Sequence, residues 1–304
     1  MTDSMLSSSV VDTPISTGVP LQASVSDWLA QHLPQAVQVV PPQWLGALET
    51  ALAACLVRPA VVFVAPEDNP DVPITAVMSL GFLASERPWS FADLEVLQQR
   101  LLSLRLTQAI GDCLIIAQVQ PVYTVGRRAQ QDPATPLMLA QAPYPSVNVS
   151  RGGEVTYHGP GQVVIYPITG LQGQMRDMRR FLQRLTETTV ASLLPYGLEP
   201  VEATEDYPTG VWVTSADLPE SLPQKIASIG IAVKQKQGCW VTAHGIAINI
   251  TNALAPFQAI SPCGLSPDVM TTLALASPSA LPAEAWQVLL AQWVLRWLSQ
   301  SRLP

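Results

Sequence analysis

The stretch RGGEVTYHGPGQVVIYPI, residues 151–168, holds four glycines and a proline in its first eleven positions, and a continuous apolar run follows. Glycine is favoured in a loop where the backbone needs a positive φ, or where a ligand must approach without a Cβ in the way. The loop lacks the GK[ST] ending of a phosphate-binding loop, and a strand rather than a helix follows, which excludes a dinucleotide fingerprint. An ordinary tight turn is the alternative. A ligand site is favoured by the neighbouring charge, hydroxyls and imidazole of Arg151, Thr156, Tyr157 and His158.

The segments around this loop predict an α+β fold, a mixed β-sheet with packed helices. A core helix is predicted after Ser90 as N-cap, with Asp93 three residues later and an apolar face of Leu94, Leu97, Leu101 and Leu104. A second helix is predicted over about 175–194. The predicted strands are CLIIAQVQPVYTVG (113–126), PSVNVS (145–150), QVVIYPI (162–168), GVWV (210–213), KIASIGIAV (225–233) and CWVTAHGIAINI (239–250), the last two joined by a polar hairpin turn over 234–238.

The C-terminal segment PAEAWQVLLAQWVLRWLSQ (282–300) carries large apolar side chains at helical spacing. Such a stripe is typical of a core face rather than of a ligand site. Its members are Trp286, Leu289, Leu290, Trp293, Val294, Trp297 and Leu298.

Composition and charge limit the classes of protein to which the chain can belong. Its 304 residues, 48% of them apolar, can bury a full core, and a net charge of -7 leaves no basic footprint for nucleic acid. No apolar run reaches the roughly 20 residues of a membrane-spanning helix, and no secretion signal opens the chain. The cysteines, which are Cys55, Cys113, Cys239 and Cys263, lack the CxxC spacing of a zinc site. We therefore expect a cytoplasmic protein without a metal.

Four motifs carry a resemblance to a known family. RGGEVTYHGPGQ resembles the signature of the octanoyltransferases of lipoate biosynthesis, and the resemblance continues in KIASIG (225–230), HGIAINI (244–250) and SPCGL (261–265). YTVGRR (123–128) is similar to an early motif of the same family. The resemblance implies the fold of the biotin and lipoate protein ligases, which is class II synthetase-like. It also implies transfer of an octanoyl or lipoyl group, the first step of protein lipoylation, with no cofactor.

The resemblance also implies the partners. The donor is octanoyl-acyl carrier protein, and the acceptor is a lysine of a lipoyl domain, in the E2 subunits of 2-oxoacid dehydrogenases or in the H protein of glycine cleavage. Since both partners are expected to be acidic, as this chain is, a local basic patch would assist their encounter. Our hypothesis is that Arg127, Arg128 and the helical stripe Arg176, Arg180 and Arg184 dock the carrier protein, the alternative being an ordinary wet helix face.

The resemblance covers roughly residues 77–300 and suggests a domain division. We predict a disordered arm over 1–25, which is poor in large apolar side chains. An extension of unknown role follows over 26–76, and an octanoyltransferase catalytic domain over 77–304.

The catalytic roles implied by the resemblance are a cysteine nucleophile, Cys263, and a lysine, Lys225, that tunes its pKa. A free thiol is mostly protonated at neutral pH, so a neighbouring cation is needed to stabilise the thiolate. Without the resemblance, the default interpretation would be a small buried apolar residue for Cys263 and a solvent-exposed residue for Lys225. His244 is a possible auxiliary, with a core histidine as the alternative.

The resemblance assigns substrate contact to three segments. Small and apolar residues there would form a slot for eight carbons. The residues are Arg151, Gly152, Gly153, Glu154, Val155, Thr156, Tyr157, His158, Ser228, Ile229, Gly230, Gly245, Ile246 and Ala247.

Two other functions remain open from the sequence. An ATP-dependent lipoate or biotin ligase on the same fold would not need a cysteine nucleophile, so the SPCGL motif speaks against it. The second alternative is a non-catalytic protein that binds acyl or lipoyl carriers, against which Cys263 and Lys225 both speak.

Overall fold

The computed structural model describes residues 59–64, 74–79, 88–108, 112–171, 176–202, 204, 209–217, 222–261, 265–278, 289, 293, 296 and 297. Cys263 and the predicted arm over 1–25 lie outside these ranges. Across them no helix combines the length and the apolarity needed to cross a bilayer.

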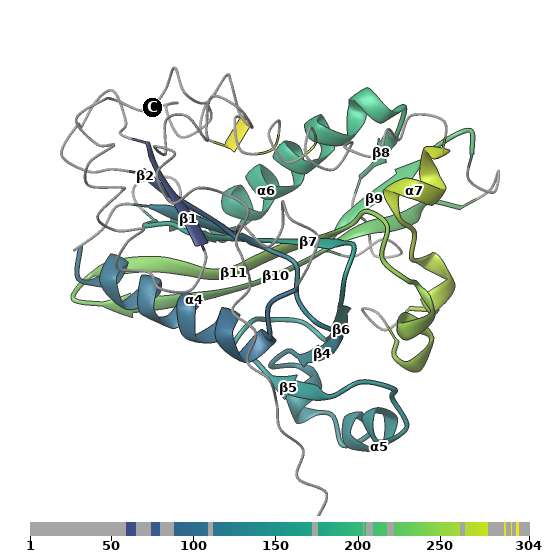
Figure 1. The fold of residues 1–304 in the computed structure, drawn as a ribbon, viewed down its shortest axis with the longest axis horizontal. Helices are drawn as coiled ribbons and strands as arrows, with labels where there is room; N and C mark the ends of the chain where they lie inside the picture. The colour runs from purple at the N-terminus through teal and green to yellow at the C-terminus, as the bar shows by residue number, and fades with distance from the viewer. Residues whose placement is uncertain are drawn as a thin grey trace, which may run out of the picture.

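An eight-stranded mixed sheet forms the centre of the fold (Figure 1). Strands β2 and β3 are parallel, and the other neighbouring pairs are antiparallel. In spatial order the strands are β1 (Pro59–Val64), β2 (Ile74–Ser79), β3 (Cys113–Ala117), β7 (Gln162–Ile168), β11 (Cys239–Asn249), β10 (Gln224–Lys236), β9 (Val211–Thr214) and β8 (Glu199–Val201). The predicted division between residues 76 and 77 falls inside β2, and it stays a prediction.

A smaller sheet of three strands lies beside the large one. Its order is β5 (Ser146–Asn148), β4 (Val122–Val125) and β6 (Val155–His158). Together with the helices, the two sheets confirm the predicted α+β class.

Two long helices cover opposite faces of the large sheet, α4 (Phe91–Leu106) on one and α6 (Met178–Leu193) on the other (Figure 1). The remaining helices are short: α5 (Thr135–Ala140), α7 (Leu273–Ala276) and the 3-10 turns η2 (Ala129–Gln131), η4 (Leu194–Tyr196), η5 (Ala255–Ala259) and η7 (Pro267–Val269).

Helix α4 begins as predicted, because the Ser90 side chain accepts a hydrogen bond from the backbone N–H of Asp93. Leu94 is fully buried, whereas Leu104 is exposed, so the predicted apolar face is only partly right. The buried face instead includes Gln98, whose Oε1 accepts the backbone N–H of His244 from strand β11. The helix is therefore fixed to the sheet by a buried polar contact as well as by apolar packing.

The predicted strand over 113–126 is wrong as one element, since it divides into β3 and β4 in different sheets. Pro121 precedes β4, and proline has no N–H to donate to a sheet ladder. The chain therefore leaves the large sheet after Ala117 and enters the small one at Val122.

The hairpin between β10 and β11 has a shorter turn than the polar stretch predicted. The strands extend to Lys236 and Cys239, and only Gln237 and Gly238 make the turn, with φ of 49° and 80°. Two positive φ values are the signature of a type I′ turn, whose twist matches that of the flanking strands. Most of the polar stretch is therefore strand that extends past the sheet core.

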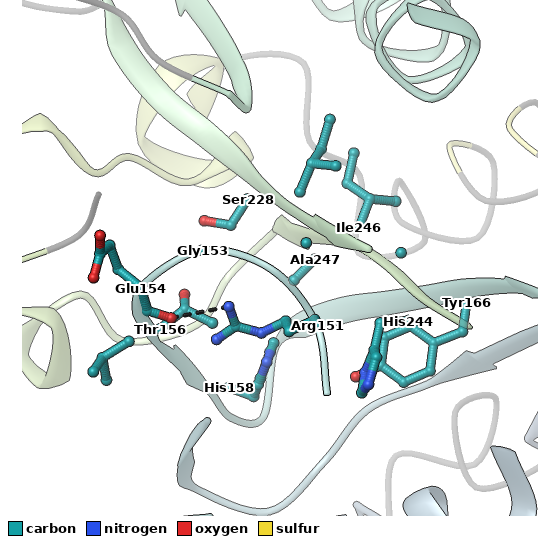
Figure 2. Close-up of a pocket in the computed structure, with 14 residues that line it drawn as sticks. Arg151, Gly153, Glu154, Thr156, His158, Tyr166, Ser228, His244, Ile246 and Ala247 are labelled. Atoms are coloured by element: carbon teal, nitrogen blue, oxygen red, sulfur yellow. Dashed lines mark hydrogen bonds between the residues drawn. The ribbon is translucent and has the colours of Figure 1, made fainter. Parts of the chain in front are cut away.

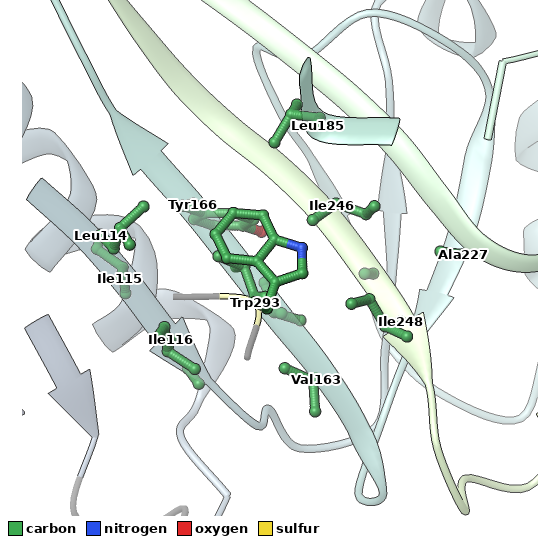
Figure 3. Packing of buried hydrophobic residues seen from close by; sticks show 14 of the residues in the cluster. Leu114, Ile115, Ile116, Val163, Tyr166, Leu185, Ala227, Ile246, Ile248 and Trp293 are labelled. Atoms are coloured by element: carbon green, nitrogen blue, oxygen red, sulfur yellow. The ribbon is translucent and has the colours of Figure 1, made fainter. Parts of the chain in front are cut away.

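The core on the α6 face of the large sheet includes part of the C-terminal segment. Figure 3 shows Trp293 packed over the sheet near Ile116, Ile246 and Ile248. The indole N–H of Trp293 donates to Thr189 Oγ1 of α6 at 2.9 Å. Leu289, Trp293 and Trp297 are fully or almost fully buried, which confirms the predicted core face at these three positions. The other members of the stripe lie outside the described residues.

Candidate active site

The glycine-rich loop is organised around a buried arginine. Arg151 Nη2 donates to the carbonyl oxygen and the hydroxyl of Thr124 at 2.7 and 2.8 Å, and Nη1 donates to the carbonyls of Gly152 and Glu154. Hydrogen bonds from a charged donor are stronger than neutral ones, and burial strengthens them further. The guanidinium therefore holds the loop against strand β4.

The glycines around Arg151 provide room for this side chain. A Cβ on Gly230 would lie 2.7 Å from Arg151 Cδ, and one on Gly126 would meet both the guanidinium and the carbonyl of Gly153. Gly153 itself has φ of +86°, a conformation that residues with a Cβ rarely adopt. The absence of a Cβ at Gly126 and Gly230 thus makes room for the side chain of Arg151.

A buried chain of hydrogen bonds leads from Arg151 to His158 and beyond. Gln162 Nε2 donates to the Tyr157 carbonyl and to Asn249 Oδ1, so its Oε1 faces His158 Nδ1 at 2.7 Å. His158 Nδ1 therefore carries the proton, and Nε2 accepts from the Thr124 hydroxyl at 3.2 Å. Burial lowers the pKa of His158 to about 4, so the ring is neutral at physiological pH.

The chain of hydrogen bonds continues toward Lys225. Asn249 Nδ2 donates to the carbonyl of Thr271, and the N–H of Thr271 donates to the carbonyl of Lys225, both at 3.0 Å. The glycine loop and the lysine strand are thus connected through buried polar contacts.

A pocket of about 50 Å³ lies between the loop and the large sheet (Figure 2). One wall comes from the loop and β6, and the other from β10, β11 and β7. The lining residues are Arg151, Gly153, Glu154, Val155, Thr156, His158, Tyr166, Ser228, Ile229, Gly230, His244, Gly245, Ile246 and Ala247.

The structure brings the three predicted substrate segments together around this pocket. Twelve of the fourteen predicted contact residues line it, as does His244; the exceptions are Gly152 and Tyr157. The Tyr157 ring packs instead against Phe257, with ring centroids 5.5 Å apart. Gly152 donates its N–H to the carbonyl of Ile231 and so joins the loop to β10.

Tyr166 lines the pocket but is absent from the predicted contacts. It lies in the apolar run QVVIYPI, where every residue is buried. A run that is buried on both faces shows no alternation that would distinguish a pocket-facing tyrosine from a core one. Thr124 and Gln162, which hold His158, were missed for the same reason.

Lys225 is fully buried on β10, in contrast to the solvated lysine expected without the family resemblance. Its Nζ donates to the carbonyl of Thr209 at 3.0 Å and lies 5.6 Å from the ring centroid of Trp212. Gly210 leaves space for the side chain, since a Cβ there would lie 2.5 Å from Lys225 Cε. The backbone of Lys225 pairs with Met270, a few residues beyond the SPCGL motif.

Neither of the two cysteines in the described ranges, Cys113 and Cys239, lines the pocket. Cys113 is buried in β3, and its burial raises the pKa of the thiol far above its usual range. Cys239 is half-buried beside the hairpin turn. Among the residues that the structure describes, there is no cluster of three or more His, Cys, Asp or Glu side chains that could hold a metal.

Residues 94–294 match the family described as the lipoyl protein ligase A/B catalytic domain. An octanoyltransferase of Caldicellulosiruptor saccharolyticus is 40% identical over 180 residues, which cover 58% of this chain and 71% of the relative. The octanoyltransferase of Desulfotalea psychrophila is 34% identical over 70% of this chain and 92% of its own length. That of Chloroflexus aggregans is 37% identical over 68% and 86%.

Proposed function

The chain belongs to the octanoyltransferase family, and we propose that it passes an acyl group through a thioester on Cys263, with Lys225 assisting. The protein is thus an acyltransferase of protein lipoylation, with the ligase-like fold that the four motifs implied. The group transferred is octanoyl or lipoyl, taken from acyl carrier protein and delivered to a lysine of a lipoyl domain.

The observation that carries the proposed mechanism is the complete burial of Lys225 on strand β10, three residues before the pocket residue Ser228. A lysine is rarely fully buried unless its ammonium group is paired or has a chemical task. This one shares strand β10 with the pocket residues Ser228, Ile229 and Gly230, and its backbone pairs with Met270 after the SPCGL motif. A cation at that position would favour the thiolate of Cys263 over the thiol.

The pocket is the proposed binding site of the acyl chain. Its walls of glycine, alanine, valine and isoleucine offer apolar contact, while Arg151 and His158 are held in place by hydrogen bonds within the protein. Because His158 is neutral and its Nδ1 proton is already donated, we assign it a positioning role rather than that of a general acid.

The reaction then proceeds in two balanced half-reactions. The Cys263 thiolate attacks the thioester carbonyl of the donor, the carrier thiolate leaves, and the Lys225 ammonium returns a proton to it. The neutral Lys225 amine then takes a proton from the acceptor lysine as that amine attacks the acyl-cysteine. An amide forms and the Cys263 thiolate is released. A thioester is more activated than the amide it becomes, so this route needs no ATP.

The partners and the compartment follow from the same proposal. The donor is octanoyl-acyl carrier protein, and the acceptors are lipoyl domains of E2 subunits and the H protein, in the cytoplasm. Arg127 and Arg128 are exposed where β4 meets the glycine loop. Their backbone N–H groups donate to the carbonyls of Arg151 and Gly153, respectively. They are the basic side chains that we place at the donor's docking surface.

Intact-protein mass spectrometry after incubation with octanoyl-acyl carrier protein tests the proposal. We expect a single octanoyl adduct on the wild-type protein, no adduct on Cys263→Ala, and a much slower one on Lys225→Ala. Cys239→Ala is the matched control, because its half-buried thiol lies at the hairpin turn and should not be acylated.

The competing functions give different results in the same experiment. Transfer to a lipoyl domain by Cys263→Ala would overturn the covalent route, and a requirement for ATP and a free acid would favour a ligase. Binding of the carrier with neither adduct nor product would favour a non-catalytic carrier-binding protein.

A further inference from the structure

The strand register gives the direction of the pocket. Ser228 of β10 lies opposite Ala247 of β11, and the next pairs along are Ile229 with Ile246, Gly230 with Gly245, and Ile231 with His244. Lys225 lies three residues before Ser228 on the same strand, so the Ser228 end is the one nearer to Lys225. His244 marks the far end, and Figure 2 shows it beside Tyr166, away from Ser228.

His244 has an unusual backbone and an unsatisfied side chain. Its φ is +59°, which is uncommon for a residue with a Cβ and marks either strain or function. The N–H donates to Gln98 Oε1 of α4, and Nε2 lies 3.1 Å from Ser150 Oγ. Nδ1 is buried and has no hydrogen-bond partner among the residues that the structure describes. The residue as a whole is 1% exposed, yet it lines the pocket.

Tyr166 completes the far end of the pocket. By the register of β7 and β11 it lies across from Gly245, because Ile165 pairs with Ile246. The rings of Tyr166 and His244 meet edge to face, with centroids 5.4 Å apart. In a regular strand, His244 would point to the face opposite that of Gly245. The positive φ at His244 accounts for its contact with Tyr166.

We propose that His244 and Tyr166 form the end wall of the acyl pocket and set the length of chain that the protein accepts, an inference that rests on the proposed function. The three residue steps from Ser228 to the His244 pair span about 10 Å at roughly 3.3 Å per residue. An extended eight-carbon chain has seven bonds of about 1.5 Å, which project to about 9 Å. The length of the pocket along the strands therefore matches the length of an extended eight-carbon chain.

The end wall limits the chain sterically. The rings of His244 and Tyr166 are both buried and lie in edge-to-face contact, so neither can move aside without disturbing the packing around it. Chains of ten or more carbons would overlap with this ring pair.

The test measures kcat/KM with acyl carrier protein loaded with hexanoyl, octanoyl, decanoyl and dodecanoyl groups. His244→Gly suits the positive φ and opens the end wall, so we expect the decanoyl-to-octanoyl ratio to rise about tenfold or more. Tyr166→Leu opens the same wall from the other strand and should raise the ratio as well. Tyr166→Phe, which keeps the ring, is the matched control and should leave the ratio unchanged.

A ratio between chain lengths within one variant does not depend on how much of that variant is folded. If wild-type protein transfers octanoyl and neither His244→Gly nor Tyr166→Leu changes the ratio, the end-wall inference is wrong and the proposed function stands. If wild-type protein transfers no acyl group of any length, the proposed function itself fails.

Discussion

At the scale of single residues, Arg151 is the centre of the site although no ligand contact is needed to explain its position. Four hydrogen bonds from its two Nη atoms reach Thr124, Gly152 and Glu154, and neighbouring glycines leave the space it occupies. A charged group that is buried and hydrogen-bonded within the protein is costly to disturb. The geometry of the loop therefore depends on the absence of a Cβ at these glycines as well as on the hydrogen bonds of Arg151.

The role of Gly230 can be tested by alanine substitution. Gly230→Ala should lower the free energy of unfolding by about 1–3 kcal/mol, because the new Cβ meets an arginine side chain that is held by hydrogen bonds and cannot move away freely. Gly152→Ala is the control, since its Cβ would lie 3.7 Å from the nearest atom, and its stability should change by less than about 0.5 kcal/mol. Urea unfolding monitored by circular dichroism measures both. Equal losses in the two variants would refute the argument.

The buried histidines give the stability of the fold a pH dependence of defined sign. Burial lowers the pKa of His158 to about 4 and that of His244 to about 3, below the usual 6.5 of an unfolded chain. As the pH falls from 6.5 toward 4, the unfolded state binds protons that the native state does not, so stability falls with pH. From pH 6.5 to 5 each histidine should cost about 1.5 kcal/mol, because the unfolded group is already half protonated at pH 6.5.

His158→Gln isolates the contribution of one of these groups. The variant should show a shallower slope of unfolding free energy against pH, by about half a proton at pH 6.5 and by almost one proton at pH 5. The slope is compared rather than the absolute stability, because the substitution also disturbs the bonds to Thr124 and Gln162. An unchanged slope would mean that His158 titrates alike in both states.

At the scale of elements, the sequence was most informative where one signal dominates. The Ser90 cap, the run of β7 and the long strands β10 and β11 were all predicted, since capping chemistry and apolar runs act locally. The division of residues 113–126 between two sheets was not predicted, because the sheet to which a strand belongs is decided by partners distant in sequence. The local signal for this division is Pro121, which stands between the two strands.

Much of the site was predictable only through the family motifs. These brought together residues from β6, β10 and β11 that no local pattern connects. The sequence predicts a loop where strand β6 lies, because glycines occur close to its four residues on both sides. The end wall was also missed: nothing local shows that the chain turns into a positive φ at His244, where an alternating strand would continue.

In the assembled fold, the predicted docking stripe Arg176, Arg180 and Arg184 is not continuous. Arg184 is not part of an exposed stripe, since its guanidinium packs 3.8 Å from the ring centroid of Trp297 and donates to the Trp297 carbonyl. Helix α6 covers the face of the large sheet opposite α4 (Figure 1). The backbone N–H of the pocket residue His244 donates to Gln98 of α4, which relates the pocket to the α4 side. Arg127 and Arg128 are the exposed arginines beside the loop.

Charge reversal distinguishes the two surfaces. Arg127→Glu combined with Arg128→Glu should raise KM for octanoyl-acyl carrier protein several-fold at low salt, with a smaller effect at high salt because exposed charges are screened. Arg179→Glu combined with Arg180→Glu on α6 is the matched control and should leave KM unchanged. A small octanoyl thioester without the carrier should be used equally well by both variants. A raised KM in the α6 variant alone would return the docking surface to the helix.

The buried hydrogen-bond chain from Arg151 through Thr124, His158 and Gln162 to Asn249 has a consequence in evolutionary terms. Replacing Thr124 by an apolar residue would take an acceptor from Arg151 and a donor from His158 in a single step. Serine would keep both roles, whereas valine, although similar in shape, would keep neither. The substitutions that these positions can accept are therefore limited to those that keep each hydrogen-bond donor and acceptor in place. Whether a substitution is accepted at one position depends on the residues at the others.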